Sequence, residues 1–301
     1  MAKIRLGTRG SPLALRQAEQ AAAALRAREP DLDIEIVTIR TTGDRIRDRR
    51  LADIGGKGLF AKEIEAALAE GRIDAAVHSV KDLETVLPEG FVLAAMLERE
   101  DPRDGLAGGA RTLAELPPGA RIGTASLRRQ AQMLARRPDL VPALIRGNVQ
   151  TRLERVRVGE FDATFLAMAG LARLDMTEHA VPIAPEEMLP AAGQGAVGIE
   201  CRAGDSVLHA RLAAIDHEPT SCCVAAERAL LASLDGSCRT PIAAHANLQD
   251  GELVLRGRLL TPDGTEMREI CRTGSAADAW TIGLDAGEAL RADAPPGALE
   301  A

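Results

Sequence analysis

The sequence predicts a mixed α/β fold, in which two lobes of largely parallel sheets and helices are followed by a small α+β domain. Three patterns predict it. Strand-like apolar runs alternate with amphipathic helical runs from residue 3, the alternation returns after residue 118, and after residue 218 a helix precedes consecutive strands. Alternation favours parallel sheets covered by helices, whereas consecutive strands flanked by helices favour an α+β unit.

The first lobe is expected to begin with three strands separated by two helices. In chain order these elements are Lys3–Thr8, Ser11–Arg28, Asp33–Arg40, Gly58–Glu70 and Ile73–Ser79. Ser11 followed by Pro12 predicts a helix start, because serine caps the first turn and proline fits the first helical position. Gly71 follows the apolar stripe of the second helix and predicts its end.

The second lobe repeats this order of elements. They are expected at Ala120–Thr124, Ser126–Arg137, Val141–Arg146, Asn148–Val158 and Phe161–Leu166, with Ser126 as the N-cap of the first helix. A short internal repeat supports related lobes, because 71–75 (GRIDA) and 159–163 (GEFDA) each lie where a helix ends and a buried strand begins. Five residues can also agree by chance.

Two polar or glycine-rich stretches, 98–104 and 190–195, are suited to crossing between the lobes. Two crossings indicate that the second lobe is inserted into the first. We therefore expect domain 1 at 1–97 and 196–215, domain 2 at 102–190 and domain 3 at 217–301.

The third domain is expected to hold a helix, two or three strands and a final helix from about Ala276. The first four elements are expected at Ser221–Leu234, Pro241–Asn247, Glu252–Leu260 and Glu266–Arg272. The alanine- and proline-rich end, 292–301, is expected to fray.

Composition narrows the class of protein. The 301 residues are 46% hydrophobic and 27% charged, enough to bury a core in more than one domain. The net charge of -7 argues against a nucleic-acid surface. No signal peptide and no run of about 18 apolar residues is visible, so we expect a cytosolic chain without a membrane partner. The five cysteines fit neither a disulfide framework nor a zinc site, so no metal is expected.

Five arginines lie where strands give way to helices: Arg9, Arg128, Arg129, Arg146 and Arg152. Cations at helix N-termini oppose the helix dipole, so several of them there indicate a site completed by an anion. Planar guanidinium groups bind carboxylates through two parallel hydrogen bonds, which favours a ligand with several carboxylates. For any one of these arginines alone, solvated surface charge is the alternative.

Lys81 and Asp82 follow a buried strand, at the edge of an α/β sheet where ligands bind. A carboxylate beside a lysine and facing arginines stays ionised, which suits it to hold N–H groups, to stabilise a developing cation or to exchange protons. A structural ion pair is the alternative. His78 lies within the strand and is expected to be packed.

Cys238 lies on a glycine-containing turn after a long helix, with Arg239 beside it to favour the thiolate. Cys222 and Cys223 lie within that helix and are expected to be small core residues. No base for a cysteine hydrolase is visible in the spacing. Cys238 is therefore interpreted as an attachment point rather than an acyl-transfer nucleophile.

Eight segments carry a family resemblance, and they are Thr8–Ala14, Gly55–Phe60, Val77–Asp82, Arg99–Asp104, Gly123–Gln130, Leu144–Val149, Pro190–Ala196 and Asp235–Cys238. In this order they resemble the signature segments of the hydroxymethylbilane synthase (porphobilinogen deaminase) family, from residue 4 to about 245. The resemblance implies two lobes like those of periplasmic binding proteins, with the site between them, and a third domain that carries the cysteine loop.

The resemblance also implies the reaction and its parts. The family condenses four porphobilinogen molecules head to tail, with loss of ammonia, on a dipyrromethane cofactor, and releases hydroxymethylbilane for porphyrin, haem and chlorophyll biosynthesis. Cys238 matches the residue that holds this cofactor by a thioether, and Asp82 matches the catalytic carboxylate. Asp82 also matches a cofactor-binding residue, as do Lys81, Thr124, Ser126, Arg128, Arg129, Arg146 and Gly147. Those to substrate-binding residues are Arg9, Ser11, Arg146, Arg152 and Gln194, the last in the hinge region. A monomer is expected.

Two residues depart from the family pattern. Glu84 stands where proline is frequent, and Asp53 stands where some members have lysine, ahead of the loop around Lys57. Neither position carries the core chemistry. The rival hypothesis is a two-lobed solute-binding or effector-sensing module, which would need the arginines but no reactive cysteine.

Overall fold

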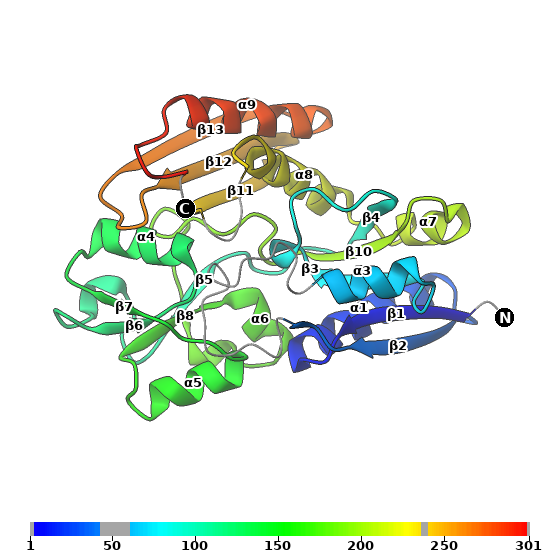
Figure 1. Cartoon of the computed structure of the whole chain (residues 1–301), viewed down its shortest axis with the longest axis horizontal. Coiled ribbons are helices and arrows are strands. Elements are labelled where there is room, and N and C mark those ends of the chain that lie inside the picture. Colours follow the sequence, from blue (N-terminus) through cyan, green and yellow to red (C-terminus); the bar gives the residue numbers. More distant parts are fainter. Residues whose placement is uncertain (1–2, 43–60, 236–239, 300–301) are drawn as a thin grey trace.

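The structure is a computed structural model that describes residues 3–42, 61–235 and 240–299 (Figure 1). Asp53, the loop around Lys57 and Cys238 lie outside these residues. The described chain forms three sheets, and Figure 1 shows them as three parts of the molecule. No helix in these ranges is long and apolar enough to span a membrane.

The first sheet has the strand order β2-β1-β3-β10-β4. Its strands are β1 (Lys3–Arg9), β2 (Asp33–Ile39), β3 (Ala75–Ser79), β4 (Phe91–Met96) and β10 (Val197–Arg202). β1 runs parallel to β2 and β3, whereas β10 is antiparallel to β3 and β4. With the helices α1 (Pro12–Arg28), α3 (Lys62–Ala69) and α7 (Ser206–Ala213), this sheet forms the first lobe.

The second sheet has the corresponding order β7-β6-β8-β5-β9. Its strands are β5 (Asp104–Ala107), β6 (Arg121–Gly123), β7 (Val141–Ala143), β8 (Ala163–Ala167) and β9 (Val181–Pro182). β6 is parallel to β7 and β8, and β5 is antiparallel to β8 and β9. The helices of this second lobe are α4 (Leu127–Arg136), α5 (Val149–Arg157) and α6 (Met168–Arg173). Both sheets are therefore mixed. The predicted parallel pairing holds for the three strands predicted in each lobe, which are β1, β2 and β3 in the first and β6, β7 and β8 in the second.

The two copies of the internal repeat, 71–75 and 159–163, have matching backbone structure in the two lobes. Gly71 and Gly159 both have positive φ, of 67° and 77°, and end α3 and α5. Three residues later, the Asp74 carboxylate accepts from the Arg5 N–H at 2.8 Å, and the Asp162 carboxylate accepts from the Arg121 N–H at 2.6 Å. The same turn thus anchors β3 to β1 and β8 to β6.

Two crossing segments join the lobes, and we call residues 97–103 the first and 183–196 the second. Both contact Glu227, a residue of α8 (Glu218–Ser233) in the third domain. Arg99 Nη1 lies 2.6 Å from Oε1 of Glu227, whose Oε2 accepts from the Gly193 N–H at 2.6 Å. Glu227 is fully buried, so the pair fixes both crossings to the third domain.

The third sheet is the antiparallel order β11-β12-β13, with strands Ile242–Gln249, Glu252–Leu260 and Met267–Ser275. It packs with α8 and α9 (Ala279–Ala292), and Leu230, Leu253 and Leu290 lie in the shared core. The small α+β domain was predicted, with α8 starting three residues earlier than expected, because Pro219 also fits a first helical turn.

The predicted fraying after residue 292 is wrong for the described residues of that segment. Ala298 is fully buried, and Ala294 and Leu299 pack against the core of the third domain. Apolar burial thus outweighs the composition of the segment, which sequence alone could not show.

Candidate active site

The sequence-predicted cations lie at strand ends and helix starts of both lobes. Arg9 ends β1, and Lys81 and Asp82 lie in the 3-10 turn η2 (Val80–Asp82) that follows β3. Arg128 and Arg129 lie in the first turn of α4, and Arg152 lies in the first turns of α5. These positions follow from the βα order of both lobes, because each such strand delivers its last residues to one edge of its sheet.

Arg128 and Arg129 share one buried partner, Asp104 at the start of β5. Arg128 Nη1 donates to Asp104 Oδ2 at 2.7 Å, and Arg129 donates to Oδ1 from Nε at 3.0 Å and from Nη2 at 2.7 Å. Asp104 is fully buried, and the arginines are 6% and 7% exposed. Burial alone would raise the pKa of Asp104, but the two arginines outweigh it and hold the pKa well below its usual value.

Gln194 of the second crossing segment connects this group to Lys81. Its Oε1 accepts from Lys81 Nζ at 3.2 Å, and its Nε2 donates to Asp104 Oδ1 at 3.0 Å and to Pro102 O at 2.7 Å. The side chain is fully buried. Through Gln194, a chain of hydrogen bonds therefore runs from Lys81 of the first lobe to Asp104 of the second.

The charges of the site act on one another. Burial lowers the pKa of Lys81 to about 8, helped by Arg129 and Arg128 and opposed by Asp82 and Asp104. Burial likewise lowers the pKa of Arg152 to about 10, helped by Arg129 and Arg146 and opposed by Asp82.

Arg146 and Arg9 extend the same cluster. The pKa of Arg146 is lowered by its burial and by Arg9. The structure thus brings together all six predicted cations, from both lobes, around two carboxylates.

Gly147 and Asn148 shape the start of α5. Asn148 Oδ1 accepts from the Thr151 N–H at 2.9 Å, and Arg152 Nε donates to Gly147 O at 3.0 Å. Gly147 has φ of 110°, and an added Cβ would lie 2.7 Å from Thr151 Cγ2. Only glycine fits this turn without displacing the helix start that carries Arg152.

The predicted hydroxyl residues serve as helix caps and turn residues. Ser11 Oγ accepts from the Ala14 N–H and Ser126 Oγ accepts from the Arg129 N–H, which confirms both predicted caps. Thr124 Oγ1 accepts from the Ser126 N–H at 3.1 Å. The hydroxyls of Ser11 and Ser126 accept capping bonds and keep their own O–H to donate, as help in ligand binding requires. Thr124 Oγ1 already donates to Ser126 O at 3.4 Å.

His78 is packed, as the sequence predicted, whereas the neighbouring Asp82 is open to solvent. His78 is 8% exposed, and its Nε2 lies 2.9 Å from Oε2 of the buried Glu200. Sequence reasoning missed Glu200 and Asp104. The burial of Arg128 and Arg129, which requires an acid beside them, is visible only in the structure. From the sequence, the segment that contains Asp104 was interpreted only as a crossing between the lobes.

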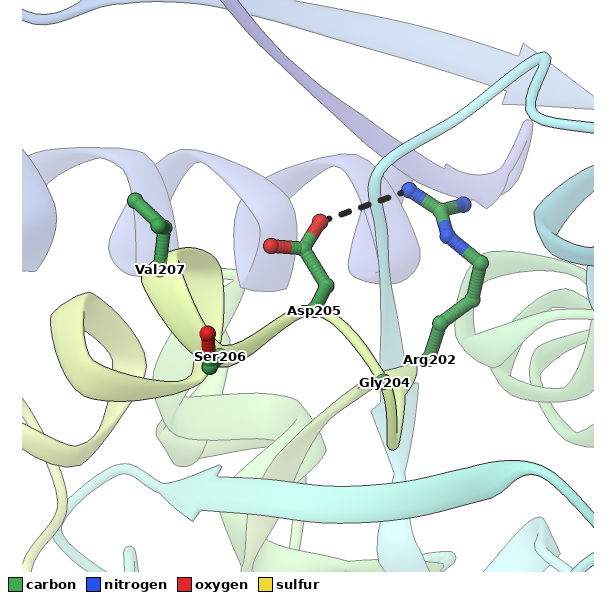
Figure 2. Close-up of a pocket in the computed structure, with 5 residues that line it drawn as sticks. All are labelled: Arg202, Gly204, Asp205, Ser206 and Val207. Carbon is green, nitrogen blue, oxygen red and sulfur yellow. Dashed lines mark ion pairs between the residues drawn. The ribbon is translucent and has the colours of Figure 1, made fainter.

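Two open pockets lie elsewhere in the described chain. One, of about 450 Å³, lies at the start of α7, where Arg202 reaches toward Asp205 at 3.6 Å (Figure 2). Arg202 also pairs with Asp74 at 3.7 Å, so this pocket has no excess of cations. The other, of about 670 Å³, includes Arg28, Glu98 and Asp216, and its charges are mixed. In the described residues, no cluster of His, Cys, Asp or Glu could hold a metal ion.

Known families match most of the chain. The dipyromethane cofactor binding domain of porphobilinogen deaminase matches residues 4–210, and the C-terminal domain of porphobilinogen deaminase matches residues 221–292. The chain belongs to the porphobilinogen deaminase family. The family resemblance inferred from the eight sequence segments is thereby confirmed.

Two curated family members are similar over nearly the whole chain. The chloroplastic porphobilinogen deaminase of Oryza sativa subsp. japonica is 52% identical over 303 residues, covering 98% of this chain and 85% of the rice protein. That of Pisum sativum is 51% identical over 306 residues, covering 98% of this chain and 83% of the pea protein. Among solved structures, the methionine binding protein MetQ is 14% identical with a TM-score of 0.44, over 70% of this chain and 88% of that one.

Proposed function

We propose that this chain joins four porphobilinogen molecules head to tail, with loss of ammonia, on a dipyrromethane held by a thioether to Cys238, and then releases hydroxymethylbilane by hydrolysis. The observation that carries the proposal is the cluster of six cations from both lobes around Asp82 and Asp104. Each pyrrole ring of this chemistry bears two carboxylates, so a chain of net charge -7 needs such a local excess of cations to hold several rings.

The residues present fit the cofactor that the family implies. Arg128, Arg129 and Lys81 lie together, which suits a ligand with several carboxylates, and the site has fewer acids than bases. When bound, the dipyrromethane supplies the free pyrrole α-carbon to which the first substrate ring is joined. We assign its carboxylates to Lys81, Arg128, Arg129 and Arg146, with Thr124, Ser126 and Gly147 shaping the helix starts beside them.

The cofactor cysteine belongs to the loop between α8 and β11. That loop leads into β11, where the Ala244 N–H donates to Pro190 O at 3.1 Å. The neighbouring Leu189 O accepts from Arg128 Nη1 at 2.7 Å. The strand that follows Cys238 is therefore hydrogen-bonded next to the arginines assigned to the cofactor, which supports the attachment.

Asp82 is the residue to which we assign catalysis. It is exposed at the end of β3, and it acts electrostatically on both Lys81 and Arg152. Its carboxylate balances the positive charge that develops on a pyrrole nitrogen and accepts or returns a proton as ammonia leaves and the rings join. Arg9, Ser11, Arg146 and Arg152 orient the incoming ring, and Gln194 keeps Lys81 in place.

Brief exposure of the full chain to limiting porphobilinogen tests this proposal. Mass spectrometry should show a ladder of covalent species separated by one pyrrole unit, with ammonia released in step. Noncovalent binding of porphobilinogen without a ladder or ammonia would instead support a solute-binding module.

We also propose that the chain acts as a cytosolic monomer, without a nucleic-acid or membrane partner. The net charge of -7 supports the lack of a nucleic-acid surface. Both curated relatives are named chloroplastic, so location needs its own test. Light scattering of the purified chain tests whether it is a monomer. Fractionation of cells that express it tests whether it is cytosolic.

A further inference from the structure

Asp104 binds both arginines of α4 in a way that limits how they meet a ligand. A guanidinium group has five N–H donors. Both hydrogens of Arg128 Nη1 are used, one by Asp104 Oδ2 and one by Leu189 O, each at 2.7 Å. In the part of the chain that the structure describes, no acceptor is found for Arg128 Nε or Nη2. Arg128 therefore presents the edge formed by these two nitrogens.

Arg129 is held by a different edge. Its Nε and one Nη2 hydrogen bind Asp104 Oδ1, and one Nη1 hydrogen binds Phe165 O at 2.9 Å. One hydrogen on each terminal nitrogen then remains. The Asp104 carboxylate thus orients two adjacent arginines so that each leaves a different pair of nitrogen donors unused. Each pair matches the two oxygens of one ligand carboxylate.

The charge of Asp104 matters as much as its shape. It is fully buried, with the carboxylate bonded to both arginines and to Gln194, so a ligand does not displace it easily. Without it, two guanidinium groups and Lys81 would face one another with little solvent between them. Like charges at such sites cost free energy and expel a proton from the weakest base, which here is Lys81.

We propose that Asp104 is a positioning residue for the carboxylate-binding site: it selects the donor edges of Arg128 and Arg129 and reduces the net charge of this arginine pair from two to one, so that Lys81 beside them stays protonated. The assignment to pyrrole carboxylates rests on the proposed function. The balance of charge does not depend on the proposed function. It is argued from the contacts of Asp104 with the two arginines and Gln194, from the contact of Gln194 with Lys81, and from the repulsion of Lys81 by the arginines.

The charge part is tested on Lys81 itself. The chain has four lysines, Lys3, Lys57, Lys62 and Lys81, so amine labelling followed by peptide mass spectrometry resolves each one. Labelling is measured against pH in full-length Cys238→Ser protein, in which no adduct contributes charge. The groups that face Lys81 are Arg128, Arg129, Asp82 and Asp104. In Asp104→Asn the labelling midpoint of Lys81 should move to lower pH, with the exposed Lys62 as internal reference.

Asp101→Asn is the matched control. Asp101 lies in the same part of the chain and also pairs with an arginine, Arg103, at 2.7 Å, but it contacts neither Arg128 nor Arg129. Its variant should leave the Lys81 midpoint unchanged. An unchanged midpoint in Asp104→Asn, with a folded protein by circular dichroism, would overturn the charge-balancing role.

The positioning part is tested with Asp104→Glu in a chain that keeps Cys238. This variant keeps the charge and lengthens the side chain, so the Lys81 midpoint should stay while the fraction of protein with a pyrrole adduct falls by at least about tenfold, as expected when bidentate alignment is lost. If Asp104→Glu carried the pyrrole adduct in the same fraction of molecules as wild type, the proposal that Asp104 selects the donor edges of Arg128 and Arg129 would be wrong. If the wild-type chain itself carried no adduct, the proposed function would fail, while the labelling result would still decide the charge part.

Discussion

Lys81 Nζ lies 3.2 Å from Oε1 of Gln194, so the lysine at the end of β3 is hydrogen-bonded to the segment that returns from the second lobe. The two lobes therefore meet through a titratable group. Its pKa is about 8, lowered mainly by burial, so the charge of Lys81 changes with pH a little above neutrality.

We predict that a carboxylate-bearing pyrrole binds the Cys238→Ser chain more weakly as pH rises above 8. Charged Lys81 attracts carboxylates, and its charged fraction falls about tenfold per pH unit above its pKa. Bound carboxylates favour the charged form, so binding above pH 8 should take up a proton, and binding at pH 6.5 should not. Calorimetry of porphobilinogen binding in buffers of different ionisation enthalpy measures this uptake. Lys81→Met should abolish it, and uptake that persists in Lys81→Met would assign it to another group.

Raising the pH should weaken ligand binding through Lys81, but it should increase this lysine's contribution to the stability of the fold. The pKa of this lysine is lower in the folded chain than its ordinary value of 10.5, so between about pH 8 and 10.5 the unfolded chain binds more protons. The lysine's contribution to the free energy of unfolding therefore rises with pH in that window, relative to Lys81→Met. A fall over the same window would contradict the lowered pKa.

Asp82→Asn should keep the fold and lose most turnover, by about a hundredfold or more. The amide keeps the shape of the exposed side chain but cannot balance a developing cation or exchange a proton. Steady-state release of ammonia measures the loss. Wild-type turnover in this variant would reassign Asp82 as structural.

Glu84→Pro is the matched change two residues away and should leave turnover within about threefold, because such surface changes away from special contacts are small. Leu83 already has ψ of 150°, as a residue before proline requires, and the Glu84 carbonyl that accepts from Arg228 at 2.8 Å is kept. Near-total loss of turnover would show that this departure from the family pattern is functional.

Replacing the arginines by lysine should stop the reaction at different stages. Lysine keeps the charge but not the two-point geometry. Arg128→Lys and Arg129→Lys should therefore impair loading of the cofactor or the first ring, because these two groups share Asp104 and lie beside Lys81. Arg146→Lys and Arg152→Lys should accumulate partly extended species. Native mass spectrometry after brief exposure to limiting porphobilinogen separates the two patterns, and one distribution common to all variants and wild type would refute the stage-specific account.

The ion pair of Arg99 and Glu227 predicts a stability effect remote from the chemistry. Glu227→Gln leaves a guanidinium that is 11% exposed without its charged partner, which should cost about 3–5 kcal/mol in the free energy of unfolding. Thermal denaturation measures it. Glu154→Gln removes a solvent-exposed pair with Arg157 and should leave Tm unchanged. Equal Tm values for the two variants would show that the buried pair does not fix the crossings.

Local patterns in the sequence predicted local structure well. The caps at Ser11 and Ser126, the glycines that end α3 and α5, and the α+β order of the third domain follow from residues close together in the chain. The antiparallel strands β4, β5 and β10 were not predicted, because their pairing is set by the crossings and not by an alternating pattern of their own.

The site was predicted in part. The cations could be found because they stand at strand ends, whereas Asp104 and Glu227 could not, since their partners lie 24 and 128 residues away along the chain. A buried acid has no local signature, and its role appears only when the partners meet. The sequence identified the cations of the site and missed the buried acids that hold some of them in place.

The most direct test of the account is the intact mass of the denatured protein. A thioether survives unfolding, whereas arginine–carboxylate contacts do not. Wild-type protein should therefore exceed the mass of its sequence by two pyrrole units, and Cys238→Ser should have the mass of its sequence alone. An unmodified mass in catalytically active wild-type protein would contradict the covalent primer and with it the central claim.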